Sequence, residues 1–136
     1  MGITLHHIPD VEPEWEQSHR VRALVIDGKS PVLTQLAQWK SSEPADYKKI
    51  MRVMERVARL DRVKDEKHVR ADGAKSDIFE MRAHRGKARV FFFYDNDQTR
   101  TAICVHTFWK GSGNQSKAFE QAATMMALWR SRNRRQ

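Results

Sequence analysis

Three consecutive strand-like runs in the second half of the chain each carry a cation into an otherwise apolar segment. The runs read Ile-Phe-Glu-Met-Arg from Ile78, Arg-Val-Phe-Phe-Phe-Tyr from Arg89 and Val-His-Thr-Phe-Trp-Lys from Val105. Aromatic and β-branched residues at this density predict strands. The Arg85-Gly86 dipeptide predicts a tight hairpin between the first two, because glycine adopts the positive φ that such a turn needs. These runs therefore predict an antiparallel sheet.

The two arginines of this hairpin are predicted to be direct neighbours. A short, even-numbered loop places Ala83 opposite Ala88 and Arg82 opposite Arg89. Like charges in that position destabilise a ladder, so an anionic group is expected beside them. One interpretation is that Glu80, on the same face as Arg82, neutralises part of the charge in a solvated ladder. The other is a phosphate site, because a guanidinium presents a fork of donors that matches two phosphate oxygens.

The charge of the whole chain favours the phosphate interpretation. Its 136 residues include 25 Lys and Arg against 17 Asp and Glu, for a formal net charge of +8, and such an excess is typical of chains that bind polyanions. We expect nucleic acid, or an acidic protein that imitates it, as the partner. The length corresponds to one domain. No apolar run approaches the roughly 20 residues of a membrane span, and no secretion signal is evident, so a cytoplasmic protein that contacts no membrane is expected.

Cysteine and histidine usage argues against a metal centre. The single cysteine, Cys104, excludes an internal disulfide and lies in an apolar run, where a buried thiol acting as a small hydrophobe is expected. The six histidines include no pair at the helical spacing of metalloprotease motifs. We therefore expect no metal and no other cofactor.

The first half of the chain predicts one strand and two helices. Residues 1–20 show no period and predict an irregular arm, whereas β-branched and aliphatic residues over 21–27 predict a strand. Ser30 suits a helix N-cap and Pro31 the first helical position. A second helix is predicted over 45–60, where apolar residues recur at steps of three and four. Its basic face is either solvated or in contact with a phosphate backbone.

The second half completes an α+β fold. Residues 61–77 predict a charged linker into the three strands, and a last helix is predicted over 116–129. The strand from 88 to 94 is apolar on both faces and is expected to be central. The sequence thus predicts a domain over 21–130, a four-stranded, mainly antiparallel sheet packed against two N-terminal helices and one C-terminal helix, and a basic tail over 131–136.

This order of elements and three short motifs resemble the RelE/HigB-like toxin superfamily, and more narrowly its phage-derived HigB-type branch. The motifs are Phe-Glu-Met-Arg ending at Arg82, Arg-Val-Phe-Phe starting at Arg89, and His-Thr-Phe-Trp-Lys starting at His106. The resemblance implies a RelE/ParE-like fold and a metal-independent endoribonuclease, an mRNA interferase that cleaves mRNA on the ribosome. It also implies a cognate antitoxin of the helix-turn-helix type. Branch members usually continue with further lysines where this chain has Gly111 to Gln115.

The resemblance and the residues together suggest catalytic roles. Metal-free cleavage requires a 2′-hydroxyl to lose its proton and attack the phosphate, while fixed cations stabilise the added charge. Arg82 and Arg89 are the candidates for this electrostatic role. On the last strand His106, Phe108 and Lys110 share a face by the period of two. His106 is then either the proton acceptor or a hydrogen-bonded structural residue, and Lys110 is a second phosphate clamp.

Further candidates for RNA binding surround these residues. His84, at the hairpin tip, is either a proton donor to the leaving 5′-oxygen or a solvated turn residue. Phe108 and Trp109 point to opposite sides, so one of them fills the core while the other is available to stack on bases. The complete set of RNA-binding candidates is His84, Arg85, Lys87, Trp109 and Lys117.

Two other classes of function stay open at the level of sequence. One keeps the fold without the chemistry, as a ParE-like inhibitor of a target such as DNA gyrase, for which the sheet cations are dispensable. The other is a phage or prophage accessory protein whose basic surface binds nucleic acid without cleaving it.

Overall fold

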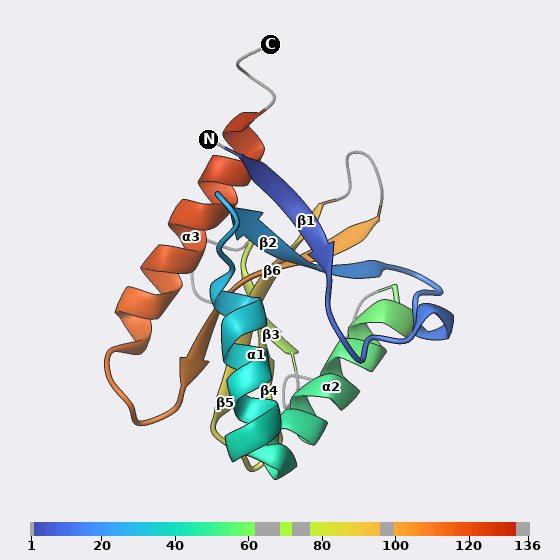
Figure 1. The fold of residues 1–136 in the computed structure, drawn as a ribbon, viewed down its shortest axis with the longest axis vertical. Coiled ribbons are helices and arrows are strands. Elements are labelled where there is room, and N and C mark those ends of the chain that lie inside the picture. Colours follow the sequence, from blue (N-terminus) through green and yellow to red (C-terminus); the bar gives the residue numbers. More distant parts are fainter. Residues whose placement is uncertain (1, 62–68, 72–76, 96–99, 133–136) are drawn as a thin grey trace.

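The computed structural model describes residues 2–61, 69–71, 77–95 and 100–132, which form an α+β fold (Figure 1). Its elements in chain order are β1 (Ile3–His7), the 3₁₀ turn η1 (Pro13–Trp15), β2 (Arg20–Ile26), α1 (Pro31–Ser42), α2 (Pro44–Arg59), β3 (Val69–Ala71), β4 (Phe79–Arg82), β5 (Ala88–Asp95), β6 (Thr101–Trp109) and α3 (Gln115–Ser131). The predicted helices and the four predicted strands are all present, with bounds that differ by one or two residues.

The sheet has six strands rather than the four predicted, in the order β1-β2-β6-β5-β4-β3. β2 pairs with β6 in parallel, and every other neighbouring pair is antiparallel. Strand β5 lies inside the sheet and is buried almost throughout, which confirms its predicted central place.

The two additional strands lie in segments predicted to be irregular. The arm predicted over residues 1–20 is wrong for residues 3–7, which form β1, and the linker predicted over 61–77 is wrong for residues 69–71, which form β3. Both strands are short: β3 has three residues, and β1 alternates between partly buried and exposed side chains only from Ile3 to His6. β1 pairs with β2, whose residues follow the η1 segment, whereas β3 pairs with the nearby β4, beginning with Ala71 opposite Phe79. After β1, Ile8 and Val11 are fully buried in the core.

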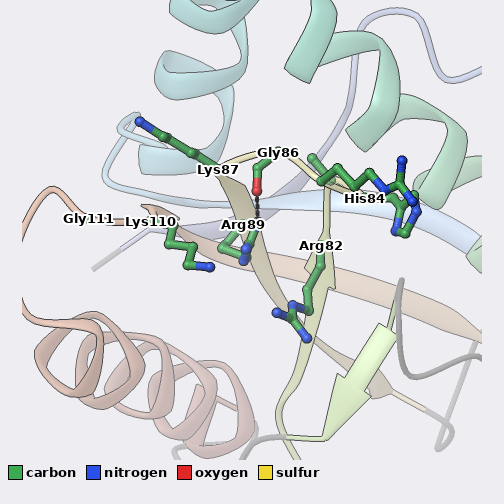
Figure 2. A pocket seen from close by; sticks show the side chains of 9 residues that line it. Arg82, His84, Gly86, Lys87, Arg89, Lys110 and Gly111 are labelled. Carbon is green, nitrogen blue, oxygen red and sulfur yellow. Dashed lines mark hydrogen bonds between the residues drawn. The ribbon is translucent and has the colours of Figure 1, made fainter.

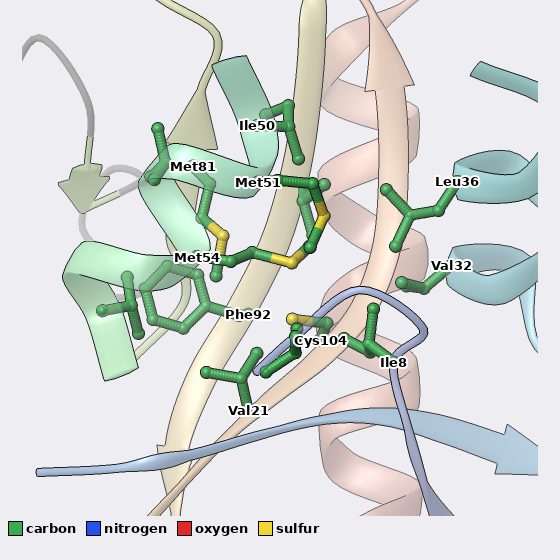
Figure 3. Packing of buried hydrophobic residues seen from close by; sticks show 14 of the residues in the cluster. Ile8, Val21, Val32, Leu36, Ile50, Met51, Met54, Met81, Phe92 and Cys104 are labelled. Carbon is green, nitrogen blue, oxygen red and sulfur yellow. The ribbon is translucent and has the colours of Figure 1, made fainter. Parts of the chain in front are cut away.

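The helices cover opposite faces of the sheet. Val90 and Phe92 of β5 pack in the cluster that contains α1 and α2, and Phe91 and Phe93 pack in the cluster that contains α3. Figure 3 shows the first cluster, in which Met51, Met54, Met81 and Cys104 fill the space between α2 and the sheet. Cys104 is fully buried in this core, as predicted, and this burial raises the pKa of its thiol to about 12.

Local capping explains where α1 begins. The Ser30 side chain accepts a hydrogen bond from the Leu33 backbone N–H at 3.2 Å, and Pro31 occupies the first turn. This is the predicted arrangement, because proline has no N–H to leave unpaired there. None of the helices in the described ranges combines the length and the apolar character that crossing a membrane requires.

Candidate functional site: a cationic pocket at the β4–β5 hairpin

A pocket of about 600 Å³ lies where the β4–β5 hairpin meets the end of β6 (Figure 2). Six of the nine predicted site residues line it, and five of these six are lysines or arginines. The lining consists of Arg82, Ala83, His84, Arg85, Gly86, Lys87, Arg89, Lys110 and Gly111. The pocket is therefore strongly cationic, with an imidazole at the hairpin tip.

The predicted register of the two arginines is confirmed. Arg82 on β4 lies directly opposite Arg89 on β5, and the Ala83 backbone N–H donates to the Ala88 carbonyl at 3.1 Å. Because side chains alternate along a strand, Arg89 points to the same face as Phe91, which is the face that α3 covers. Both guanidiniums are thus on one face and line one pocket.

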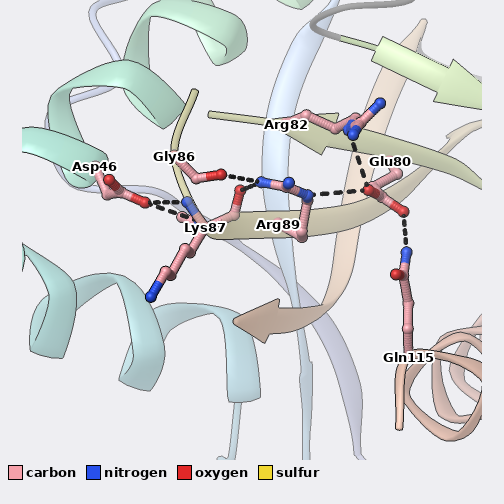
Figure 4. Close-up of polar contacts among 8 residues, drawn as sticks. Asp46, Glu80, Arg82, Gly86, Lys87, Arg89 and Gln115 are labelled. Atoms are coloured by element: carbon pink, nitrogen blue, oxygen red, sulfur yellow. Dashed lines mark hydrogen bonds and ion pairs between the residues drawn. The ribbon is translucent and has the colours of Figure 1, made fainter. Parts of the chain in front are cut away.

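One buried carboxylate serves both guanidiniums (Figure 4). Glu80 Oε1 lies 3.3 Å from Arg89 Nε and 3.6 Å from Arg82 Nε, and Glu80 Oε2 accepts a 2.8 Å hydrogen bond from the Gln115 side chain. The predicted pairing is therefore confirmed, but the solvated ladder is wrong, because the side chains of Glu80 and Arg89 are only 5% and 6% exposed. Two guanidiniums share one carboxylate, so this trio keeps one net positive charge.

The two arginines differ in how firmly they are held. Arg89 Nη1 donates to the carbonyls of Gly86 and Ala88, each at 3.0 Å. Burial, and secondarily the charge of Arg82, lower the pKa of Arg89, while Glu80 and Asp46 act in the opposite direction. Arg82 is 31% exposed, and its Nε contact with Glu80 is longer than a hydrogen bond. Arg89 is thus a fixed charge in the wall, and Arg82 is the more accessible one.

The hairpin tip differs from the prediction in which residue takes the positive φ. Arg85 has φ of 57°, while Gly86 is not in the left-handed region. Glycine is needed at position 86 for another reason: an added Cβ would lie 2.8 Å from both carboxylate oxygens of Asp46. Such a contact is too close for a side chain, so Gly86 allows α2 and the hairpin to approach each other.

Asp46 is the functional candidate that sequence reasoning missed. It lies in the first turn of α2, and one of its oxygens, Oδ2, accepts hydrogen bonds from the backbone N–H groups of Lys87 at 2.6 Å and Ala88 at 2.9 Å. An acidic residue in the first turn of a helix is expected for dipole reasons alone, so its sequence position gave no signal for this second role.

Three predicted residues lie outside the pocket lining. Trp109 packs against Trp39 of α1, with ring centroids 5.8 Å apart, and Lys117 is exposed in the first turns of α3. His106, opposite Phe91 on the α3 face, is half-buried. Burial lowers the pKa of His106, and a hydrogen bond with Gln121 offsets part of that effect. Of these two histidines, therefore, His84 lines the pocket with the two arginines and His106 does not.

The two aromatic residues at the end of β6 point to opposite sides, as predicted. Phe108 packs against the α3 cluster, and Trp109 packs against the α1 and α2 cluster. Both rings are partly buried by this packing. Each therefore contributes to a core, whether or not its exposed edge contacts a base.

Comparison with known proteins identifies a family. Residues 37–130 match the family model described as Phage derived protein Gp49-like (DUF891), a range that includes the whole pocket. A search of curated proteins gives no match. The Gp49-like family belongs to the RelE/HigB-like toxin–antitoxin superfamily and is associated with RelE-type toxins, which are ribonucleases. Because the match covers more than half of the sequence, this chain belongs to the Gp49-like family of phage-derived proteins.

Proposed function

We propose that this protein is the toxin of a type II toxin–antitoxin system of the HigB type, and that it is a metal-independent endoribonuclease that cleaves mRNA on the ribosome. The observation that carries this proposal is the placement of Arg82 and Arg89 on one face, in one pocket, with a single shared carboxylate. The family match supports a toxin at the level of the superfamily. Residue roles rest on the geometry alone.

The charge of the pocket suits a phosphodiester. Arg82, Arg85, Lys87, Arg89 and Lys110 line it. Glu80 offsets only part of their charge. A phosphate group presents several acceptor oxygens, and guanidiniums bind two of them at once. An RNA backbone therefore complements this surface better than a neutral ligand would.

The proposed reaction uses these cations to stabilise a transition state. The 2′-hydroxyl gives its proton to solvent water, and its oxygen attacks the adjacent phosphorus. The bond from phosphorus to the 5′-oxygen breaks, and that oxygen takes up a proton, which leaves a 2′,3′-cyclic phosphate and a 5′-hydroxyl. Arg89 supplies a fixed charge and Arg82 a more accessible one for the additional negative charge.

Proton transfer is assigned to the pocket imidazole. His84 lines the pocket beside Arg82 and Arg85, and imidazole exchanges protons near neutral pH. We place it at the leaving 5′-oxygen, with Lys110 as a second phosphate ligand. The proton-acceptor role predicted for His106 is left out of this proposal, because that ring packs beside α3, outside the pocket lining.

The proposed partners are mRNA, the ribosome and an antitoxin. A toxin–antitoxin family implies an antitoxin that binds and neutralises the toxin. We infer a small helix-turn-helix protein for this role, as in the HigB-type branch. Acidic side chains of such a partner would complement the pocket cations.

Cleavage assays with purified ribosomes and a defined message test this function. We expect Arg82→Ala to lower the cleavage rate by about 100-fold or more, as removal of one transition-state donor does in other enzymes. Arg89→Ala is expected to have an effect at least as large, with a loss of stability that thermal unfolding would record. The cut ends should carry a 2′,3′-cyclic phosphate.

Arg130→Ala is the matched control. Arg130 is an exposed arginine paired with Asp77 at 3.0 Å, near the far end of α3, a helix of 17 residues and thus roughly 25 Å long. Its substitution should leave cleavage unchanged. Absence of cleavage by the wild-type protein would refute the ribonuclease. Growth inhibition that survives both Arg82→Ala and Arg89→Ala would instead favour a ParE-like, non-catalytic inhibitor.

A further inference from the structure

Asp46 contacts the backbone of the β4–β5 hairpin, whose residues form part of the pocket wall. It belongs to α2, and it reaches hairpin residues 41 and 42 positions later in the chain. Its carboxylate is not part of the pocket lining. In Figure 4 it lies on the far side of the hairpin backbone from Glu80 and Arg82. The hydrogen bonds of Asp46 therefore reach the pocket through the hairpin backbone.

The two hydrogen bonds of Asp46 continue through peptide units, one to the guanidinium of Arg89 and the other to the backbone N–H of Lys110. Lys87 N–H, which donates to Asp46, and the Gly86 carbonyl, which accepts from Arg89 Nη1 at 3.0 Å, belong to one peptide unit. Ala88 N–H, which also donates to Asp46, and the Lys87 carbonyl, which accepts from the Lys110 backbone N–H at 2.8 Å, belong to the next.

In each of these peptide units, the N–H thus donates to the Asp46 carboxylate and the carbonyl accepts a hydrogen bond from Arg89 or Lys110. Hydrogen bonds arranged in series polarise one another and strengthen. The first series ends on the guanidinium of Arg89, and the second ends on the backbone from which the Lys110 side chain projects. A displacement of Asp46 would therefore move both cations relative to Arg82.

We propose that Asp46 is a positioning residue for the cationic pocket, setting Arg89 and Lys110 in place through two consecutive peptide units of the hairpin. This inference rests on the proposed function for its catalytic consequence, but its structural part does not. It assigns to α2 a part in the site, although no residue of α2 lines the pocket.

The close approach at Gly86 supports this role. A Cβ at position 86 would meet both Asp46 oxygens at 2.8 Å and the Ala83 Cβ at 3.0 Å. The hairpin is therefore shaped to bring its backbone onto the carboxylate. Arg85, one residue earlier, has φ of 57°, a value uncommon for a non-glycine residue, and it lies within the turn in which the Gly86 N–H donates to the Ala83 carbonyl at 2.9 Å.

The charge of Asp46 is also suited to its position. A carboxylate in the first turn of a helix is stabilised by the helix dipole, and Asp46 lies two residues after Pro44, where α2 begins. Its negative charge favours the charged form of Arg89 and raises the pKa of that guanidinium, against the effect of burial. One carboxylate therefore serves the start of α2, the hairpin backbone and the buried arginine.

Three variants test the role of Asp46. Asp46→Ala removes the acceptor of both hydrogen bonds. Asp46→Asn keeps one side-chain oxygen, and in the structure a single oxygen of Asp46 accepts both hydrogen bonds. Glu43→Ala is the control, because Glu43 precedes the same helix and makes no side-chain capping bond. Solvent exchange of the Lys87 and Ala88 amides and the Nε–H resonance of Arg89, followed by NMR, report the geometry without any substrate.

We expect Asp46→Ala to speed exchange of the two amides at least about tenfold and to shift the Arg89 resonance, since their acceptor is lost. On ribosomes, kcat should fall by about 10- to 100-fold, the range expected when catalytic groups are misplaced, with a smaller change in KM. Asp46→Asn should recover most of the amide protection and of kcat, and Glu43→Ala should match the wild type in all these measurements.

Two outcomes separate this inference from the proposed function. If the wild-type protein cleaves RNA but Asp46→Ala retains its kcat or its amide protection, the positioning role is overturned. If the wild-type protein cleaves no RNA, the ribonuclease fails, and the positioning of Arg89 is then judged on the amide and Nε–H signals alone. Should Asp46→Ala fail to fold, Asp46→Asn decides: unprotected amides in that folded variant would show that the charge, and not only the oxygen, is required.

Discussion

Two carboxylates, Asp10 and Glu80, each contact two polar or cationic side chains, yet their surroundings differ. Asp10 Oδ2 accepts from the Tyr47 hydroxyl of α2 and from Lys40 of α1, the latter at 2.8 Å, and its side chain is 42% exposed. Glu80 pairs with Arg82 and Arg89 and is 5% exposed. The pattern of contacts is similar, so burial is what separates a surface cluster from a candidate site.

The difference in burial changes the energetics of the two clusters. Exposed ion pairs are screened by water and contribute little to stability. Charges that have been taken out of water make the fold less stable than well-packed apolar side chains would, and they become strongly destabilising when one partner is removed. Phe91 and Phe93 continue the apolar core on the same face as Arg89. A buried charged cluster beside them is therefore a cost to stability relative to apolar packing, as expected if it serves the proposed RNA-binding site.

Removal of Glu80 should produce the largest effect. Glu80→Ala leaves the buried Arg89 beside Arg82 without the carboxylate that both contact. We expect a loss of about 3 kcal/mol in the free energy of unfolding, the range for breaking a buried ion pair, measured by urea denaturation. Gln115 also loses its acceptor, so the start of α3 should exchange its amide protons faster.

A matched surface substitution sharpens this test. Glu55 pairs with Arg59 one helical turn later at 2.7 Å, and both side chains are about one-third exposed. Glu55→Ala should lower the free energy of unfolding by less than about 0.5 kcal/mol. Equal losses for Glu80→Ala and Glu55→Ala would break the distinction between buried and exposed clusters.

The titration of His106 tests whether the sheet face beneath α3 is desolvated near Glu80. Its expected effect on the free energy of unfolding is smaller than that of Glu80→Ala. Burial lowers the pKa of His106 in the folded protein, so below about pH 6.5, the ordinary value of an imidazole, the unfolded chain binds a proton that the folded one does not. Stability should therefore fall as the pH drops from 6.5 toward the lowered pKa, and level off below it. Urea denaturation at pH 7.5 and pH 5.5 measures this difference.

His106→Gln is the variant that isolates this titration. It keeps a polar side chain beside Gln121 but has no proton to gain in this range. The pH-dependent loss of stability should be smaller in His106→Gln than in the wild-type protein. The same loss in both proteins would show that other groups cause it and that the imidazole is not desolvated.

Local rules predicted the parts of the site that depend on neighbouring residues. The pairing of Arg82 with Arg89 followed from the even-numbered loop and the period of two, and it needed nothing beyond the hairpin itself. The start of α1 followed from Ser30 and Pro31 for the same reason. The positive φ of the turn was assigned to Gly86, whereas Arg85 takes it. This error is a shift by a single residue within the hairpin.

The features that sequence reasoning missed depend on contacts between distant segments. Asp46 meets the hairpin 41 positions later, and β1 pairs with β2, from His7 opposite Arg22 to Ile3 opposite Ile26. The depth at which Glu80 is buried depends on the docking of Gln115 and α3. None of these contacts leaves a period or a motif in the chain, so only the folded arrangement reveals them.

Substitution of Asp10 should have the smallest effect on the free energy of unfolding. The comparison between the Asp10 and Glu80 clusters depends on this effect being small. Hydrogen bonds from Lys40 and Tyr47 lower the pKa of Asp10 below 3.8, so its contribution is present above about pH 3.8 and is lost as the pH falls through the lowered value. Asp10 has φ of 71°, a conformation that asparagine also tolerates, so Asp10→Asn changes the charge with little strain. Because the side chain is 42% exposed, we expect a loss below about 1 kcal/mol at pH 7, reduced further in 1 M salt and shrinking as the pH falls through the lowered pKa of Asp10. A loss as large as that of Glu80→Ala would mean that exposure does not set the strength of these pairs, and the burial of Glu80 would then no longer distinguish the cationic pocket from an ordinary surface cluster.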